Sequence, residues 1–238
     1  MFTAHEKTLF CLDDNVQIDK IDNTDIVNMV KPFKGTTTLA FITKDGIVIA
    51  VDSRATTGSY IASRTVHKVI KVNKYLLSTM AGGAADCFYW EKRMGTYAKY
   101  FELTYGHRLP VKSAVNYLRM CISGRRGLSI GTMVCGWDDD GPNIFYLDDD
   151  GTMVQGDHFS VGSGSTIAYS VLENGYNYNM SKEDALELGK TAIFHAMHRD
   201  AYSGGSCNLY FMDSQGWEFL GEHDFNVLYD EHLRRKKV

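Results

Sequence analysis

The pattern of hydrophobic and polar positions divides the chain into a polar leader and a body of strands and helices. Residues 1–34 are polar and weakly periodic, and they end in Lys31-Pro32-Phe33-Lys34. The body then opens with β-branched and apolar runs at Thr37–Thr43 and 46–52, which predict two strands. The turn sequence Lys44-Asp45-Gly46 between them predicts a hairpin.

Strand-like and helix-like periods alternate along the rest of the body. A second strand pair is predicted at 69–72 and 75–81, and apolar residues at helical spacing predict helices at Ala84–Tyr105 and Val111–Ile122. A capping box at Ser181 and Asp184 marks the start of a later helix. The remaining predicted elements are strands at 131–137, 143–147, 152–155 and 158–162, helices at 165–173 and 181–199, and strands at 206–212 and 217–220.

The order of these elements is strands, two helices, strands, two helices, strands. Hairpin-type connections favour antiparallel sheets, and each helix pair can cover one outer face of a stacked pair of sheets. We therefore predict an α+β fold, a four-layer αββα sandwich with two antiparallel sheets between helix layers. The body shows no internal repeat and no interdomain linker, which predicts one domain over residues 36–238.

Composition excludes several classes of function. The net charge of −4 gives no reason to expect nucleic acid as a partner. No apolar run approaches the roughly 20 residues of a membrane span, so we expect no membrane partner either. The five cysteines are scattered without a C-x-x-C pair, a pattern typical of reduced thiols in the cytosol.

The candidate chemistry begins at Gly35-Thr36-Thr37-Thr38. A threonine run can simply open an edge strand, because threonine favours strands. Its neighbours, however, include ionisable groups. Asp52 closes the second strand of the first hairpin and can lie near the start of the first strand, while Lys68 precedes an apolar strand and can reach the same end.

Three glycine-containing turns join strands and helices in the same body. Residues 81–84 lead into a helix N-terminus, where free backbone N–H groups can bind an anion. Residues 162–165 form a second strand-to-helix turn, and residues 200–205 connect a helix to a strand.

Six blocks of sequence together carry a close resemblance to a known family. From Thr36 to about Asn226 the chain resembles the catalytic β subunits of the 20S proteasome, in particular the chymotrypsin-like, beta type-5 class of the N-terminal-nucleophile hydrolases (peptidase family T1). The matching blocks are GTTTLAF at 35–41, DSRAT at 52–56, YIAS at 60–63, TMAGGAADC at 79–87, FSVGSGS at 159–165 and RDAYSGG at 199–205.

The resemblance implies a threonine-type endopeptidase and assigns catalytic roles. The Thr36 hydroxyl would be the nucleophile and its freed α-amine the general base. An ordinary α-amine has a pKa of about 7.7–8.0 and a lysine one of about 10.4, which favours the amine as base, although a strongly lowered pKa would favour Lys68. The other implied roles are orientation of Lys68 by Asp52, an oxyanion N–H from Gly82, and positioning of the amine and its water by Ser163, Asp200 and Ser203.

The resemblance also gives the leader a function. While residues 1–35 remain attached, the α-amine of Thr36 is part of the Gly35–Thr36 peptide bond and is not available as a base. We therefore predict a propeptide at 1–35 that is removed by autocatalytic cleavage between Gly35 and Thr36.

The implied substrate pocket is uncharged, which predicts cleavage of unfolded polypeptides after large hydrophobic residues. The family's S1 positions correspond to Ala55, Val66, Met80 and Ala84, with Thr56, Ala62 and Ser63 beside the cleft. We expect no metal and no cofactor. His195 and His198, with Asp200 nearby, suggest a metal site on a helix, but two histidines without a defined third ligand are usually surface or structural residues.

The implied partners are the other α and β subunits of a 28-subunit barrel with two outer α and two inner β heptameric rings. Assembly chaperones and regulatory caps would also bind it, and its work would be ATP- and ubiquitin-dependent protein degradation in the cytoplasm and nucleus. Two other classes stay open: a non-catalytic structural β subunit, and an N-terminal-nucleophile amidase that acts on small amides. The basic tail at 234–237 is either solvated or binds a partner.

Overall fold

The computed structural model describes residues 35–236, which belong to one unit of the chain. The predicted leader at 1–34 lies outside the described residues, and so does Lys237 of the basic tail. The division into a propeptide and a catalytic domain therefore stays a prediction.

The first sheet has five antiparallel strands and carries the candidate threonine at one end. Its strands follow the order β11-β1-β2-β12-β13. The hairpin predicted at the start of the body is β1 and β2, and the register pairs Thr38 with Val51. The strands are β1 (Thr37–Thr43), β2 (Gly46–Val51), β11 (His158–Gly162), β12 (Ser206–Asp213) and β13 (Gly216–Asp224).

The second sheet is also antiparallel and follows the order β10-β9-β8-β6-β5, with the two-residue strand β7 pairing with β8. A separate two-stranded ribbon, β3 with β4, follows the first hairpin. The strands are β3 (Ala55–Thr57), β4 (Tyr60–Ser63), β5 (Val69–Asn73), β6 (Leu76–Thr79), β7 (Ala81–Gly82), β8 (Ile130–Asp138), β9 (Gly141–Asp148) and β10 (Met153–Gln155).

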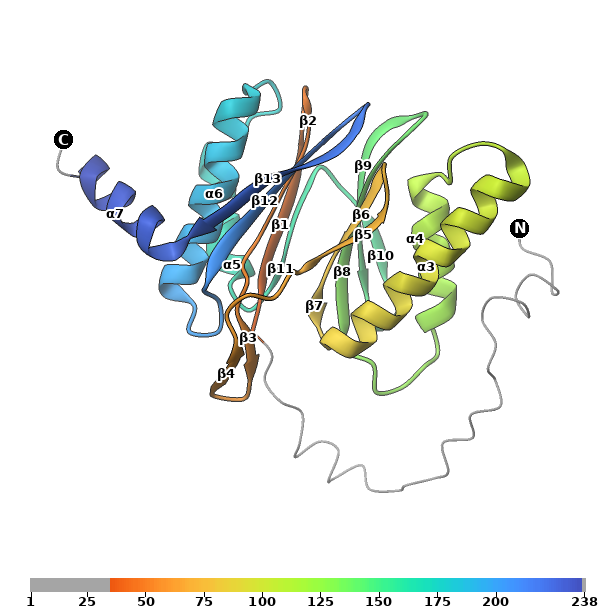
Figure 1. Cartoon of the computed structure of the whole chain (residues 1–238), viewed down its shortest axis with the longest axis horizontal. Helices are drawn as coiled ribbons and strands as arrows, with labels where there is room; N and C mark the ends of the chain where they lie inside the picture. The colour runs from red at the N-terminus through yellow and green to blue at the C-terminus, as the bar shows by residue number, and fades with distance from the viewer. Residues whose placement is uncertain (1–34, 237–238) are drawn as a thin grey trace. The chain divides into compact units, whose positions relative to one another are not determined.

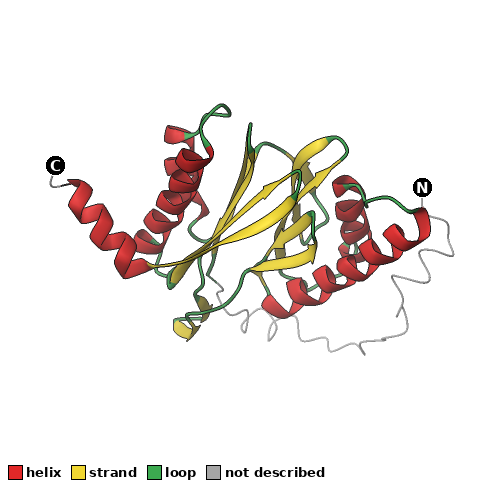
Figure 2. Cartoon of the chain, turned by 45° about the horizontal axis from the view of Figure 1, so that its top comes forward, coloured by secondary structure: helices red, strands yellow, loops and turns green. Residues whose placement is uncertain are grey.

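Helix pairs cover the outer faces of the two stacked sheets (Figures 1 and 2). The pair α3 and α4 packs on the second sheet, and the pair α5 and α6 packs on the first. This arrangement confirms the predicted α+β sandwich of four layers. The helices are α3 (Ala84–Tyr105), α4 (Val111–Ile122), α5 (Ser165–Gly175), α6 (Lys182–Arg199) and α7 (Phe225–Lys236).

The two faces of β1 belong to two different cores, as the period of a strand requires. Leu39 and Phe41 join the core between the first sheet and its helices. Ala40 and Ile42 join the core between the two sheets. Because both faces of this strand are buried, its register is strongly specified, and so is the position of Thr36 at its start.

The predicted cap of α6 is confirmed, with one difference. The Ser181 hydroxyl accepts a hydrogen bond from the Asp184 backbone N–H at 3.1 Å. In a standard capping box, the side chain of the third helical residue accepts a hydrogen bond from the N-cap backbone N–H. Here the Asp184 carboxylate instead accepts a hydrogen bond of 2.8 Å from the Ser181 hydroxyl.

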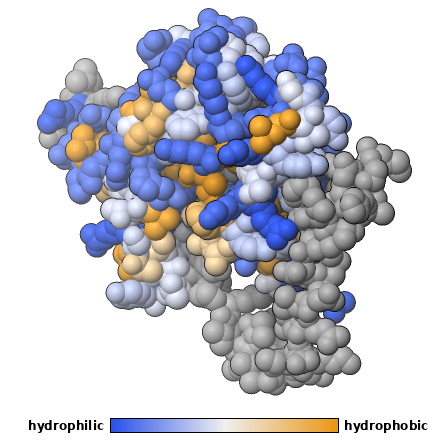
Figure 3. All heavy atoms as spheres, turned by 45° about the vertical axis from the view of Figure 1, so that its right-hand side comes forward, coloured by the Kyte–Doolittle hydropathy of each residue, from blue (hydrophilic) through white to orange (hydrophobic). Residues whose placement is uncertain are grey.

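The β3–β4 ribbon and the last helix were not predicted from the sequence, and β6 and β7 were predicted as one strand. The ribbon is only a few residues long on each side of the turn at Gly58. The signal for α7 was present, since Phe225, Leu228, Tyr229 and His232 recur at helical spacing. On the face drawn in Figure 3, on the side of α3 and α4, apolar residues form small groups among hydrophilic ones.

Candidate active site

The hairpin of β1 and β2 brings Asp52 to the start of β1, as predicted. The Thr37 backbone N–H donates to Asp52 Oδ1 at 2.9 Å, and the Asp52 N–H donates to the Thr37 carbonyl at 3.0 Å. The Asp52 carboxylate is fully buried. A buried charge requires partners, and this one is held by backbone donors as well as by a cation.

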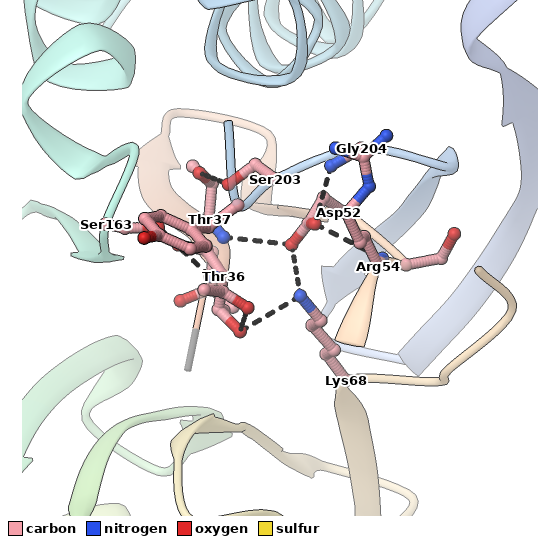
Figure 4. A network of polar contacts seen from close by, with 12 residues as sticks. Thr36, Thr37, Asp52, Arg54, Lys68, Ser163, Ser203 and Gly204 are labelled. Carbon is pink, nitrogen blue, oxygen red and sulfur yellow. Dashed lines mark hydrogen bonds and ion pairs between the residues drawn. The ribbon is translucent and has the colours of Figure 1, made fainter. Parts of the chain in front are cut away.

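That cation is Lys68, which immediately precedes β5 in the second sheet. Its Nζ lies 2.5 Å from Asp52 Oδ1 and 3.0 Å from Thr36 Oγ1, and the residue is only 2% exposed. Figure 4 shows the lysine pointing between the carboxylate and the threonine hydroxyl. The two sheets thus each contribute one member of an ion pair that reaches the candidate nucleophile.

Burial lowers the pKa of Lys68 below its ordinary value, and the attraction of Asp52 offsets part of that effect. A lowered lysine pKa makes the neutral amine more accessible near neutral pH. The structure therefore keeps Lys68 as a candidate proton acceptor alongside the Thr36 amine.

The peptide bond before Thr36, where cleavage is predicted, lies directly at the Thr36 hydroxyl. Thr36 Oγ1 donates a hydrogen bond of 2.6 Å to the Gly35 carbonyl, and the Gly35 N–H donates to Thr56 Oγ1 at 2.9 Å. A Cβ at position 35 would collide with the backbone and Cβ of Tyr202. The absence of a side chain at Gly35 therefore permits its close approach to Tyr202.

The end of β11 supplies the next group around Thr36. Because Thr37 pairs with Gly162, Ser163 comes beside the Thr36 backbone nitrogen, which donates to Ser163 Oγ at 3.2 Å. The Ser163 hydroxyl in turn donates to Asp200 Oδ2 at 2.6 Å. If the bond to Gly35 is cut, the new α-amine will lie next to this serine.

Asp200 and Ser203 form the outer part of the same network. The Ser203 hydroxyl donates to Asp200 Oδ2 at 2.6 Å and lies 2.7 Å from Thr37 Oγ1. Ser163 contacts the Thr36 nitrogen directly, whereas Asp200 contacts it through Ser163. The structure thus brings together all of the predicted catalytic side chains.

Gly82 lies in β7, next to Gly83, the N-cap of α3. Its φ of 103° is a conformation that favours glycine. The nearby Met80 donates its N–H to the Lys68 carbonyl at 2.8 Å, which ties this segment to the lysine. The role of the Gly82 N–H as an oxyanion donor stays a prediction.

Comparison with known proteins identifies the family. A model of the proteasome subunit family matches residues 32–212. The chain is 48% identical over 205 residues to proteasome subunit beta type-5-B of Arabidopsis thaliana, covering 85% of this chain and 75% of the relative. It is 50% identical over 198 residues to proteasome subunit beta type-5 of Gallus gallus (82% and 77%), and 47% identical over 200 residues to proteasome subunit beta type-8 of Homo sapiens (83% and 72%). The chain belongs to the proteasome subunit family.

The family match confirms the resemblance carried by the six sequence blocks. All of the candidate site residues of this proteasome subunit, from Gly35 to Ser203, lie inside the matched range. The match covers most of the chain but assigns no role to a single residue, so those roles rest on the geometry around Thr36.

The predicted pocket residues come from the ribbon, the segment that follows it and the start of α3. Ala55 and Thr56 lie in β3, and Ala62 and Ser63 lie in β4. Val66 donates its N–H to the Ser53 carbonyl at 2.9 Å, while Met80 lies between β6 and β7 and Ala84 is the first residue of α3. Of this group, Thr56 contacts the residue next to the scissile bond, through the Gly35 N–H.

Three residues of the network were not predicted from the sequence. Thr37 forms hydrogen bonds with Asp52 through its backbone N–H and with Ser203 through its hydroxyl. The Gly204 N–H donates to Asp52 Oδ2 at 3.0 Å, and the Arg54 N–H donates to the same oxygen at 3.3 Å. Thr37 was predicted only as a strand residue, and the contacts of Gly204 depend on a loop that no local pattern places.

Neither a metal cluster nor a membrane-spanning helix is found within residues 35–236. In that part of the chain, no three histidine, cysteine or acidic side chains are grouped so as to hold a metal ion. The described helices are also too short or too polar to cross a bilayer. His195 and His198 instead pack their rings against Phe194.

Proposed function

We propose that this proteasome subunit is a threonine-type endopeptidase with Thr36 as its nucleophile. The observation that carries the proposal is the position of the Thr36 hydroxyl, 3.0 Å from Lys68 Nζ and 2.6 Å from the Gly35 carbonyl oxygen. A hydroxyl that lies beside a candidate base and beside the carbonyl group of the preceding residue supports acyl transfer to that hydroxyl.

The first substrate is the chain itself. Thr36 Oγ attacks the Gly35 carbonyl carbon, the bond from that carbon to the Thr36 nitrogen breaks, and the leader is carried as an ester on the hydroxyl. The hydroxyl proton passes through Lys68 to the departing nitrogen, because the α-amine is not yet free. Water then hydrolyses the ester, which releases residues 1–35 and leaves Thr36 as the first residue.

In the hydrolysis of later substrates, a different group acts as the general base. The freed α-amine lies beside Ser163, and its ordinary pKa of about 7.7–8.0 leaves a useful fraction neutral at neutral pH. Lys68 and Asp52 then stabilise the alkoxide that develops on Thr36. This division gives both candidate bases a role, Lys68 in leader removal and the amine in turnover.

We expect the substrate preference to follow from the predicted S1 positions, which lie on the β3–β4 ribbon and in the segments that follow it, up to the start of α3. Ala55, Val66, Met80 and Ala84 are uncharged, and Met80 adapts to bulky apolar groups. The relatives named beta type-5 support assignment to the chymotrypsin-like class. Cleavage after large hydrophobic residues follows.

The specificity is tested in assembled particles in which the other catalytic subunits are inactivated. We expect kcat/KM for a peptide with leucine or tyrosine before the cut to exceed that for arginine or glutamate by roughly tenfold or more, since an apolar pocket gives little compensation for a buried charge. A matched peptide series that differs only at this position gives the ratio. A preference for the basic or acidic peptide would contradict the proposed pocket.

The subunit works within a larger particle. Membership of the family supports assembly with other proteasome subunits. The particle is a 28-subunit barrel of two outer α and two inner β heptameric rings, which degrades unfolded polypeptides in ATP- and ubiquitin-dependent degradation. Assembly chaperones and regulatory caps bind it, and it acts in the cytoplasm and nucleus.

The two other classes differ in measurable ways. A structural β subunit would keep its leader in a finished particle, whereas the network around Thr36 supports a catalytic one. A small-amide hydrolase would have the mass of a free subunit or a small oligomer. The family match supports the very large particle instead.

A further inference from the structure

A buried acidic residue on α3 takes no part in the proposed chemistry. Glu91 is only 1% exposed and lies on the side of α3 that packs on the second sheet. Its Oε1 lies 2.9 Å from the hydroxyl of Thr132 on β8. Figure 1 shows α3 lying over this sheet.

The hydroxyl of Thr132 has more contacts than its single proton can serve. Besides Glu91 it lies 2.7 Å from the Thr79 carbonyl and 2.7 Å from Ser78 Oγ. The Thr79 carbonyl can only accept a hydrogen bond, and an ionised Glu91 could likewise only accept, so the two would compete for one proton. When Glu91 is protonated, its O–H group and the Ser78 hydroxyl both donate to the Thr132 oxygen. The Thr132 hydroxyl then donates its own proton to the Thr79 carbonyl. Only in this state does each of the three contacts of the Thr132 hydroxyl contain a hydrogen.

The surroundings of Glu91 favour the same state. Its second oxygen, Oε2, is buried and has no hydrogen-bond partner, a costly arrangement for a carboxylate. Burial raises the pKa of Glu91 to about 8, although hydrogen bonding to Thr132 and Ser78 acts in the opposite direction.

The cations near Glu91 do not offset its burial. Lys71 of β5 and two lysines of α3, Lys92 and Lys99, line a surface hollow of about 390 Å³, at whose inner side Glu91 also lies. Arg125 lies farther along the surface, with its guanidinium over the Trp90 ring. All four side chains are exposed, so water and salt screen their charges from the buried carboxyl group.

The hydrogen-bonded set ends next to the candidate active site. Thr79 directly precedes Met80, whose N–H donates to the Lys68 carbonyl at 2.8 Å. Gly82, the predicted oxyanion donor, follows two residues later. A change at Thr132 therefore acts on the backbone that positions Lys68, Met80 and Gly82.

We propose that Glu91 is a positioning residue that acts as a neutral acid, and that its proton holds the 79–82 segment in the geometry needed for catalysis; this rests on the proposed peptidase function. Loss of the proton at alkaline pH leaves the set around Thr132 one hydrogen short. The segment then loosens, and catalysis falls although Thr36, Asp52 and Lys68 are intact.

The test is the pH profile of kcat in assembled particles carrying Glu91→Gln. Glutamine keeps the shape, donates from its NH₂ group to Thr132 and does not ionise. With a pKa of about 8, the protonated fraction falls roughly tenfold between pH 7 and pH 9. We expect kcat of the parent to fall up to about tenfold more than that of Glu91→Gln over this range. Superimposed alkaline limbs would overturn the proposal.

A second pair of variants decides the question if Glu91→Gln does not assemble. Thr132→Ser keeps the hydroxyl and should keep the parent profile. Thr132→Val keeps the volume, removes the hydroxyl, and should lower kcat at pH 7 by severalfold while removing the Glu91-dependent alkaline limb. A parent-like profile in Thr132→Val would overturn the proposal. The proposed function fails separately, if the hydrolysis by the parent particle does not depend on Thr36.

Discussion

Replacing Thr36 with alanine is expected to leave the leader attached and to abolish hydrolysis by this subunit. The substitution removes the oxygen that lies 2.6 Å from the Gly35 carbonyl oxygen, so no ester can form. Loss of a hydrolase nucleophile reduces kcat by roughly 10⁶-fold. Mass spectrometry of the purified particle reports the leader, and a peptide with a large hydrophobic residue before the cut reports the activity.

Serine at position 36 is the matched control. Thr36→Ser keeps the hydroxyl and the contact with Lys68 Nζ, so the leader should be removed and activity retained. If the alanine variant were processed at the normal site to the normal extent, self-cleavage would be refuted. Hydrolysis at the parent rate in that variant would remove Thr36 from the mechanism.

Replacing Lys68 with methionine is expected to have the second largest effect. The substitution keeps much of the side-chain volume but leaves the Asp52 carboxylate buried without its cation. Breaking one partner of a buried ion pair costs about 3–5 kcal/mol of stability. Loss of the charge that faces Thr36 Oγ1 should also reduce kcat by roughly 10²–10³-fold, the scale for removal of one electrostatic stabiliser.

Peptide hydrolysis and leader processing measure the effect in the same particle. Lys44→Met is the matched control, because Lys44 is exposed in the turn between β1 and β2 and should behave like the parent. Retained leader in Lys68→Met would support lysine as the proton acceptor of the first cut. Parent-like processing and kcat in Lys68→Met would contradict the role assigned to the ion pair.

The layers of the fold could be predicted because most strands and helices carry their own periodic pattern. The helices Ala84–Tyr105 and Val111–Ile122 were predicted with their observed bounds. The β3–β4 ribbon was missed because strands of three and four residues are too short to show a period. The last helix was missed although Leu228 and its neighbours show helical spacing.

The candidate site could be predicted to the extent that neighbouring strands fix it. The position of Asp52 near Thr36 follows from the hairpin, because antiparallel pairing brings the end of β2 beside the start of β1. Lys68 precedes β5 in the second sheet, and Ser163 follows β11, which pairs with β1 from far along the chain. The resemblance to the family assigned the roles of both residues. The contacts of Gly204 depend on the folded loop, and no local pattern shows them.

Glu91 illustrates a different limit of the sequence. Cys87, Met94 and Ala98 lie on the buried face of α3 at helical distances from it, so its burial could have been inferred. Its partner Thr132 lies on β8, which follows α3 and α4 in the chain. The proton balance of the set depends on three distances that only the folded chain defines.

The proposed mechanism requires that the peptide bond before Thr36 is cut to free its α-amine. The intact mass of this polypeptide, measured after purification of the native particle, tests that requirement most directly. We expect a chain that begins at Thr36. A chain that keeps its leader in a finished particle would contradict the proposed mechanism and would leave this subunit without a free N-terminal threonine.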